Sequence, residues 1–406
     1  MKKIKNVVVI GAGKSGRGYV GELLYDEGID ITYVDVDKEL VEKMRDQKYY
    51  TVYKYDDHGH EEIVVVDKYQ VLHPLSQHEE YLEAMEKADL IMTAVFPDAF
   101  EQLAKDFTEL LRRNMDRQRD KRIVITLGSN YVGLKEKYDV LMRMFLNENE
   151  IEYYKKYFLF VESIILRVSS MPTVEQEMKD KLSIQGGNRP TLQVNRCITE
   201  AFRSEELPDF FILEEDTLKI MRLKIWKANT LHCSLAFMGK YYGKQFIYEC
   251  ARDDQISKYA FYASEEGDNA LAKLYGASTK YSEADLTDTW KSYQDDNLQD
   301  FVDRVGADPI RKLSRNERFI GPALLCMKYH IFPYFICKCA AYGFFYSDKT
   351  NGDIVSKVKE EGIEKTIETV CGLNLMEQNE KLIYDMILHS YYEILQENPV
   401  RKLTCK

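Results

Sequence analysis

A lysine, an asparagine and a histidine share one expected helix at a spacing that suits alcohol–ketone chemistry without a metal. They are Lys224, Asn229 and His232, in the segment Lys-Ile-Trp-Lys-Ala-Asn-Thr-Leu-His. At about 100° per residue, Asn229 lies roughly 140° and His232 roughly 80° around an α-helix from Lys224. We expect the three side chains to reach one cleft, where the amine takes the hydroxyl proton while the amide and imidazole hold the oxygen. This spacing alone is weakly specific, and Lys227 in the same helix is expected to be an ordinary solvated lysine.

A glycine-rich turn near the start of the chain predicts a dinucleotide site. The β-branched run 6–10 is typical of a buried parallel strand, and it leads into Gly11-Ala-Gly13-Lys-Ser-Gly16 and then a helix. Gly11 permits the tight turn, Gly13 lets a pyrophosphate approach the backbone, and Gly16 lets helix and strand pack closely. The helix start presents N–H groups to phosphate. A second strand ends at Asp35, whose carboxylate suits the ribose hydroxyls and repels a 2′-phosphate, so the expected cofactor is NAD.

Strand and helix alternate through the first half of the chain, which predicts a mostly parallel, doubly wound sheet. Strands are expected at 30–35, 89–95, 122–126 and 159–165, helices at 38–45, 81–87 and 100–113, and a hairpin at 50–66. Ligands of such sheets lie outside the carboxyl ends of the strands. The expected cofactor-binding residues therefore also include Lys14, Ser15, Thr93, Ala94 and Val95, and Asn130 follows another strand end.

Helical periodicity dominates the second half. Helices are expected at 216–244, 254–275, 282–305, 321–345, 354–368 and 377–397. The predicted fold is α/β, with an N-terminal Rossmann-type doubly wound sheet followed by a mostly α-helical C-terminal domain. The expected boundaries are 1–195 for the NAD-binding domain and 196–406 for the substrate and catalytic domain, with a cofactor in the first meeting Lys224 of the second.

Composition excludes several classes of protein. The 56 basic and 67 acidic side chains of the 406 residues give a formal charge of −11, which disfavours nucleic acid and anionic membranes as partners. No apolar stretch approaches the roughly 20 residues of a membrane span. The eight cysteines include no Cys-x2-Cys pair and favour reduced thiols in a cytoplasmic protein. We expect a small-molecule substrate, and the oligomeric state stays open between monomer and dimer.

Several motifs together resemble the mannitol dehydrogenase family, the polyol-specific long-chain dehydrogenases. The resemblance covers nearly the whole chain, and its most specific parts are the Lys224 helix and a later block. The motifs are Gly-Ala-Gly-Lys-Ser-Gly-Arg-Gly-Tyr-Val-Gly at 11–21, Asp-Leu-Ile-Met-Thr-Ala-Val at 89–95, Lys-x4-Asn-Thr-Leu-His at 224–232, Asp-Arg-Val-Gly at 303–306, Asp-Pro-Ile-Arg-Lys-Leu-Ser at 308–314 and Arg-Phe-Ile at 318–320.

The resemblance implies metal-independent, NAD-dependent interconversion of a polyol and a ketose or of their phosphates, and a hexitol phosphate and a ketose phosphate are the leading hypothesis. It makes Lys224 the general acid–base, Asn229 and Asn130 the pair that holds the oxyanion, and His232 the residue that orients the hydroxyl. Lysine's ordinary pKa, about 10.4, is too high for a base at neutral pH, and burial beside a nicotinamide cation would lower it. Arg311 and Lys312 offer two cations for a substrate phosphate, or a surface ion pair with Asp308 or Glu317.

Departures from the family pattern leave alternatives open. Ser129 stands where the family commonly has an acid, Leu166 where it has aspartate, and Gly321 where close relatives have lysine. Arg167 survives beside Leu166 and is expected either to bind substrate or to tie the domains together. The same chemistry on an unphosphorylated polyol or a hexuronate is one alternative. A non-catalytic NAD-binding protein is the other.

Overall fold

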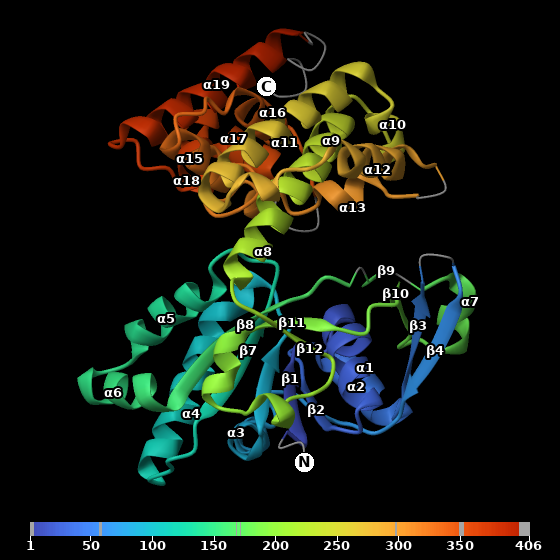
Figure 1. Cartoon of the computed structure of the whole chain (residues 1–406), viewed down its shortest axis with the longest axis vertical. Coiled ribbons are helices and arrows are strands. Elements are labelled where there is room, and N and C mark those ends of the chain that lie inside the picture. The colour runs from blue at the N-terminus through green and yellow to red at the C-terminus, as the bar shows by residue number, and fades with distance from the viewer. Residues whose placement is uncertain are drawn as a thin grey trace. The chain divides into compact units, whose positions relative to one another are not determined.

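The computed structural model describes residues 4–56, 59–167, 169–170, 172–296, 299–348 and 353–397. Within those residues, the first part of the chain forms an eight-stranded sheet in the order β12-β11-β8-β7-β6-β1-β2-β5 (Figure 1). All neighbouring strands run parallel except β11 and β8, which are antiparallel. The strands are β1 (Asn6–Ile10), β2 (Asp30–Val34), β5 (Gln70–Leu72), β6 (Leu90–Thr93), β7 (Ile123–Gly128), β8 (Phe158–Ile164), β11 (Leu192–Asn195) and β12 (Phe211–Glu214).

Helices cover both faces of this sheet, which confirms the doubly wound prediction. Because side chains alternate along a strand, Val7 and Val9 of β1 join the core on one face, and Val8 and Ile10 join the core on the other. The first face is covered by α1 (Glu22–Asp26) and α2 (Lys38–Gln47). The second face is covered by α3 (His78–Lys87), α4 (Phe100–Asp116), α5 (Leu134–Phe145) and α6 (Glu148–Tyr157).

The predicted hairpin is confirmed as β3 (Tyr50–Tyr55) and β4 (Glu61–Val66), which pair antiparallel. Sequence analysis did not foresee that the hairpin belongs to a second sheet, in the order β4-β3-β10-β9 among the described residues. Its other strands, β9 (Ser169–Ser170) and β10 (Ile184–Gly187), follow more than 100 residues later, and α7 (Val174–Lys179) lies between them in the chain.

The chain divides into two compact units, Met1–Leu218 and Lys219–Lys406. The division lies later than the expected boundary at 195/196. Residues 196–218 belong with the first unit because β12 pairs with β11 at the edge of the large sheet.

The second unit is helical, as expected. Its long helices α9 (Asn229–Tyr241), α11 (Asp254–Tyr275), α15 (Ile320–Lys328), α16 (Tyr334–Gly343) and α19 (Gln378–Glu397) pack together through buried apolar side chains. Shorter helices surround them: α10 (Ile247–Ala251), α12 (Glu283–Gln294), α13 (Val302–Gly306), α14 (Pro309–Lys312), α17 (Ile354–Glu361) and α18 (Ile363–Cys371).

Three helices expected as continuous are each interrupted. The stretch 321–345 breaks between α15 and α16, where His330 has φ 57° and Pro333 precedes the new helix. The stretch 354–368 breaks at Gly362, which has φ 82°. The stretch 282–305 ends first at Gln294 and resumes only at Val302.

No helix in the described part of the chain is long and apolar enough to cross a membrane. The seven cysteines that the structure describes are free thiols.

Candidate active site

The glycine turn after β1 has the geometry of a pyrophosphate cradle. Gly11 has φ 97°, and a Cβ there would lie 2.5 Å from the carbonyl oxygen of Ala94. A Cβ at Gly16 would lie 1.8 Å from the carbonyl oxygen of Gly11. A Cβ at Gly13, in contrast, would meet nothing within 4 Å. Gly11 and Gly16 are therefore required by packing, whereas Gly13 has open space beside it, which is compatible with its expected place under a pyrophosphate.

This turn lies at the position in the sheet where dinucleotides bind. In the strand order, β2 and β5 lie on one side of β1, whereas β6, β7 and β8 lie on its other side. The connections therefore diverge between β1 and β6. The Gly11 N–H donates to Val34 O at 2.8 Å, and the Ala94 N–H donates to Ile10 O at 2.8 Å. These bonds join the carboxyl ends of β1, β2 and β6 into one edge.

The carboxylate of Asp35 is anchored beside the turn. Its Oδ2 accepts the Ala12 N–H at 2.7 Å, and its Oδ1 accepts the Asp37 N–H at 2.9 Å. Each carboxylate oxygen has a second lone pair, so both can still accept a ribose hydroxyl. Asp35 thus also supports the turn itself, a role that its spacing in the sequence did not suggest.

The other expected cofactor residues differ in how deeply their side chains are buried. Lys14 is exposed and Ser15 is half-buried at the start of the helix. Thr93 is buried, and its hydroxyl lies between β6 and β7, 3.4 Å from both Thr126 O and the Gly128 nitrogen. Only the backbone of Thr93 therefore remains for a nucleotide. Ala94 and Val95 follow it and are half-buried.

Ser129 and Asn130 follow β7 at the same edge. The buried Ser129 hydroxyl donates to the carbonyl oxygen of Val95, so the serine found at the family's acidic position ties two strand ends together. Asn130 is exposed beside it.

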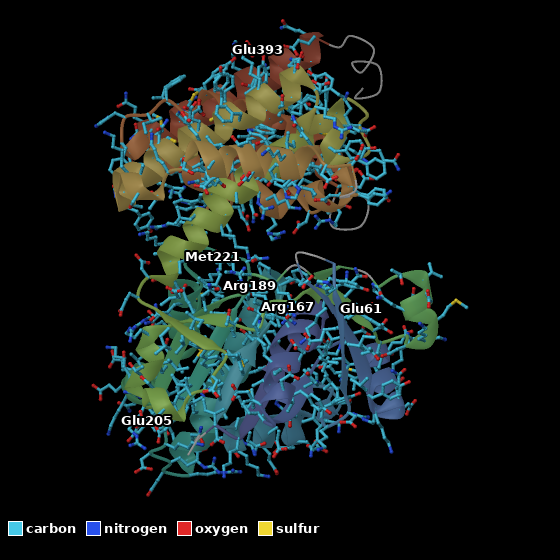
Figure 2. All side chains as sticks on the ribbon, turned by 45° about the vertical axis from the view of Figure 1, so that its right-hand side comes forward. Glu61, Arg167, Arg189, Glu205, Met221 and Glu393 are labelled. Atoms are coloured by element: carbon cyan, nitrogen blue, oxygen red, sulfur yellow. The ribbon has the colours of Figure 1, made fainter. Side chains whose placement is uncertain are left out.

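Arg167, labelled in Figure 2, has a buried side chain in the first unit. Its side chain is 0 % exposed, and its Nη1 donates to Glu22 Oε2 at 2.6 Å and to Gly18 O at 2.9 Å. Its Nη2 donates to Arg189 O at 2.7 Å, and the guanidinium lies 4.5 Å from the centre of the Tyr19 ring. These contacts within the first unit account for the burial of the guanidinium, while the two expected roles of Arg167, binding substrate or tying the domains together, stay predictions.

In the second unit, the catalytic motif begins with a π-helical turn. The π-helix η5 (Lys224–Ala228) joins α8 (Thr217–Leu223) to α9, and the Asn229 N–H donates to Lys224 O across five residues. Such a turn places residue i+5 more nearly over residue i than an α-helix does. Lys224, Asn229 and His232 are all half-buried. The π turn therefore aligns Lys224 and Asn229 better than the expected α-helical angles, and insertions of this kind are frequent at functional sites.

The indole of Trp226 anchors this π turn. Its Nε1–H donates to Asn316 O at 2.9 Å, and its ring occupies the space beside Gly321, where a Cβ would lie 2.5 Å from the indole. The guanidinium of Arg222 lies 4.9 Å from the ring centre.

His232 is oriented by a carboxylate that sequence analysis missed. Its Nε2 lies 2.9 Å from Asp300 Oδ2, and its ring lies 5.0 Å from that of Tyr293. Burial alone would raise the pKa of Asp300, but the hydrogen bond from His232 and the charges of His232 and Arg304 hold the pKa below its ordinary value. Asp300 therefore remains an acceptor for the imidazole.

Lys227 is buried, so the expectation of a solvated lysine is wrong. Its Nζ lies 2.8 Å from Asp268 Oδ1, donates to Thr279 O at 2.5 Å and sits 3.6 Å from the centre of the Tyr281 ring. This lysine stabilises the fold on a different side of the helix from Lys224.

Arg311 and Lys312 lie in a compact charge cluster of the second unit. Arg311 donates to Asp308 Oδ2 at 2.5 Å and to Glu317 Oε1 at 2.9 Å, which fits the ion-pair alternative. The buried Lys312 donates to Ala307 O, and Arg318 pairs with Glu317 at 3.2 Å. Burial lowers the pKa of Lys312 to about 8, with the charges of Arg318 and Arg311 acting in the same direction. With Lys312 protonated, the three cations are balanced by Asp308, Glu317 and Asp348, whose carboxylate accepts the Asp308 N–H at 2.7 Å.

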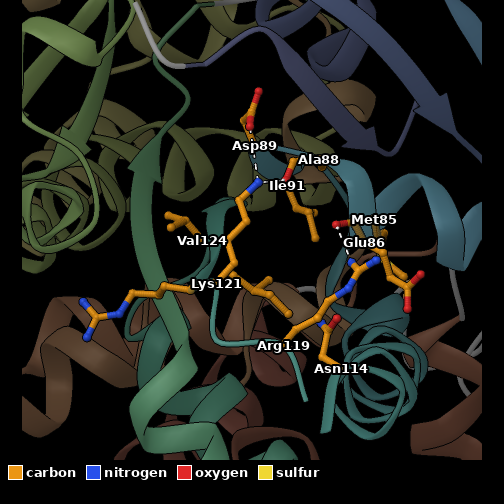
Figure 3. Close-up of a pocket in the computed structure, with 11 residues that line it drawn as sticks. Met85, Glu86, Ala88, Asp89, Ile91, Asn114, Arg119, Lys121 and Val124 are labelled. Carbon is orange, nitrogen blue, oxygen red and sulfur yellow. Dashed lines mark hydrogen bonds and ion pairs between the residues drawn. The ribbon is translucent and has the colours of Figure 1, made fainter. Parts of the chain in front are cut away.

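A small cavity lies away from the predicted cofactor edge, near the amino ends of β6 and β7 (Figure 3). It is lined by Glu86, Asp89, Asn114, Arg119 and Lys121 among others, and has room for about 20 Å³. That volume suits a single water and cannot admit a nucleotide. Separately, the described residues contain no group of three or more His, Cys, Asp or Glu side chains arranged to hold a metal ion.

Comparisons with known proteins agree with this geometry. The mannitol dehydrogenase Rossmann domain model matches residues 5–187, and the mannitol dehydrogenase C-terminal domain model matches residues 217–396. The chain belongs to the mannitol dehydrogenase family. Its membership confirms the resemblance seen in the motifs.

Relatives cover nearly the full chain. The mannitol-1-phosphate 5-dehydrogenase of Thermoanaerobacter pseudethanolicus is 27% identical over 390 residues, covering 94% of this chain and 96% of that protein. The protein of the same name from Halalkalibacterium halodurans is 27% identical over 368 residues, covering 89% and 95%. Among solved structures, Pseudomonas fluorescens mannitol 2-dehydrogenase in a ternary complex with NAD and D-mannitol superposes with a TM-score of 0.71 at 12% identity, covering 98% and 93%. A D-sorbitol dehydrogenase gives a TM-score of 0.64 at 13% identity, covering 97% and 93%. The structural likenesses show the shared fold.

Proposed function

We propose that the protein is an NAD-dependent dehydrogenase that interconverts a hexitol phosphate and a ketose phosphate, of the mannitol 1-phosphate and fructose 6-phosphate type. The dehydrogenase class follows from membership of the mannitol dehydrogenase family. The relatives named mannitol-1-phosphate 5-dehydrogenase support the phosphorylated substrate. The observation that carries the proposal is the π turn that aligns Lys224 with Asn229, followed one helical turn later by His232.

The residues of the first unit fit NAD. Gly13 offers an open backbone to the pyrophosphate, and the anchored Asp35 carboxylate offers acceptors to the ribose hydroxyls. NAD, when bound, supplies the hydride acceptor.

The residues of the second unit carry out the proton chemistry. The neutral Lys224 amine accepts the proton of the substrate hydroxyl as the hydride leaves the carbon that bears this hydroxyl. The Asn229 amide donates to the oxygen as negative charge develops on it. With Asp300 accepting from His232 Nε2–H, Nδ1 carries a lone pair that can accept the substrate hydroxyl. No metal enters this scheme, because the amine performs the proton transfer.

The direct test is to incubate the purified protein with NAD and mannitol 1-phosphate and follow the absorbance of reduced cofactor. Steady formation of NADH supports the proposal. Tight NADH binding without turnover on any polyol, polyol phosphate or uronate would leave a nucleotide-binding protein instead.

Asp35 should determine the preference for NAD over NADP. Replacing Asp35 with Asn removes the negative charge while keeping an oxygen for the Ala12 N–H, so repulsion of a 2′-phosphate falls. We expect kcat/KM with NADP to rise about tenfold relative to that with NAD, measured as the ratio of the two. An unchanged ratio would show that Asp35 does not face the adenosine ribose.

Lys312 should confer a pH dependence that is specific to phosphorylated substrates. Below pH 8 its ammonium attracts the substrate phosphate, and above pH 8 the neutral amine does not, since its pKa is about 8. We expect KM for mannitol 1-phosphate to rise as pH increases from 7 to 9, by roughly tenfold at the upper end. Lys312→Met should give the high KM at every pH, while KM for unphosphorylated mannitol should not change.

An unphosphorylated polyol is the second candidate substrate. Arg311 already pairs with the carboxylates of Asp308 and Glu317, so its charge is less available to a substrate phosphate, and this favours the unphosphorylated substrate. Equal kcat/KM for mannitol and mannitol 1-phosphate would establish this alternative and remove the phosphate role of Lys312.

A further inference from the structure

Arg17 directs its side chain into the protein instead of toward solvent. It follows Gly16 in the π-helix η1 (Gly16–Gly21) and is only 7% exposed. Its Nε donates to Ala12 O at 2.6 Å, and its Nη1 donates to Leu182 O at 2.8 Å. The guanidinium lies 5.3 Å from the centre of the Tyr50 ring. One buried cation thus connects the glycine turn to the segment that enters β10.

Hydrogen bonds hold the Ala12–Gly13 peptide and the peptide on either side of it. The Ala12 N–H donates to Asp35 Oδ2 at 2.7 Å, and Arg17 binds the Ala12 carbonyl oxygen. The backbone N–H of Arg17 also donates to Gly13 O at 3.0 Å. Because the C=O and N–H of a planar trans peptide point in opposite directions, drawing the Ala12 carbonyl inward turns the Gly13 N–H outward. Gly13 itself is exposed, and a Cβ built on it would meet nothing within 4 Å.

We propose that Arg17 is a positioning residue for the dinucleotide, which holds the Ala12–Gly13 peptide so that the Gly13 N–H faces the pyrophosphate. The inference rests on the proposed use of NAD. Arg17 does not touch the cofactor, because its guanidinium binds two backbone carbonyls in the interior. Its positive charge below the turn also favours an anion above it.

The geometry requires arginine in particular. The planar guanidinium donates to two carbonyl oxygens in fixed directions, whereas a lysine ammonium is a flexible point charge. Arg17→Lys therefore keeps the charge but loses the fixed orientation of the peptide.

The test compares two ligands that differ in the pyrophosphate. ADP-ribose contains adenosine and a pyrophosphate, whereas adenosine lacks the pyrophosphate. Both are measured as competitors of NADH in a fluorescence titration. For Arg17→Lys we expect the Kd of ADP-ribose and of NADH to rise about tenfold or more, with that of adenosine unchanged. Turnover at saturating NAD should stay near wild type, so the change appears in KM for NAD. Arg45→Lys is the matched control, because Arg45 donates to Val71 O and Gln77 at the end of α2, away from the turn.

Two outcomes overturn the proposal. One is a folded Arg17→Lys protein with wild-type ADP-ribose affinity, and the other is an equal loss for ADP-ribose and adenosine, which indicates general loosening. If the variant does not fold, Gly13→Ala replaces it, since the added methyl meets open space. Gly13→Ala should fold and lose ADP-ribose affinity selectively, and unchanged affinity there also overturns the proposal. Failure of the wild-type protein to bind NADH at all would instead contradict the proposed function.

Discussion

Replacing Lys224 with Ala should lower kcat by about 10³-fold, with little change in melting temperature. Positioned acid–base groups contribute about 10²–10⁴-fold to enzymatic rates, and the proposed scheme gives Lys224 the only proton transfer from the substrate. The measurement is NADH formation from NAD and mannitol 1-phosphate, together with a thermal melt and an NADH titration. NADH affinity should remain near that of the wild type, because the cofactor residues lie in the first unit.

Lys227 provides a matched control on the same helix. Its buried ion pair with Asp268 predicts the opposite result for Lys227→Ala, a large loss of stability, since the substitution leaves a carboxylate without its cation. If Lys224→Ala turned over at the wild-type rate, the proposed base would be wrong. If both variants lost only stability, the helix would have a structural role alone.

Replacing Arg167 with Met should lower the free energy of unfolding by about 3 kcal/mol, the lower end of the range for a broken buried ion pair. The substitution removes the partner of Glu22 and leaves the carbonyls of Gly18 and Arg189 without their donor. Glu22 keeps Lys54 at 2.7 Å, which limits the loss. Chemical denaturation with urea measures the change directly.

The control is Arg122→Met, which breaks a more exposed pair with Glu200 at 3.4 Å. Exposed pairs contribute less than about 1 kcal/mol, so its effect should be small. An Arg167→Met protein with wild-type stability and a raised substrate KM would instead support the prediction that Arg167 binds substrate.

Features encoded within short segments could be predicted from the sequence. The glycine turn was predictable because its constraints are largely local: Gly11 has φ 97°, and a Cβ at Gly16 would collide with the carbonyl oxygen of Gly11. The alternating strands and helices of the first unit were predictable because continuous β-branched runs indicate strands buried on both faces. The hairpin β3–β4 was predictable because its strands adjoin along the chain, whereas its partner β10 is distant.

Long-range partners account for most of what the sequence did not reveal. His232 and Asp300 are 68 positions apart, and the chain between them carries no signal that the two side chains meet. Lys224 and Lys227 are the same residue type three positions apart, and only the tertiary structure shows that Asp268 pairs with Lys227. The π turn was missed because α-helical periodicity was assumed throughout the segment.

The contact between Trp226 and Gly321 makes the effects of substitutions at the two positions interdependent. A Cβ at 321 would lie 2.5 Å from the indole, so any larger residue there would require a smaller or shifted side chain at 226. A substitution at 321 alone would therefore displace the indole that anchors the π turn through Asn316 O.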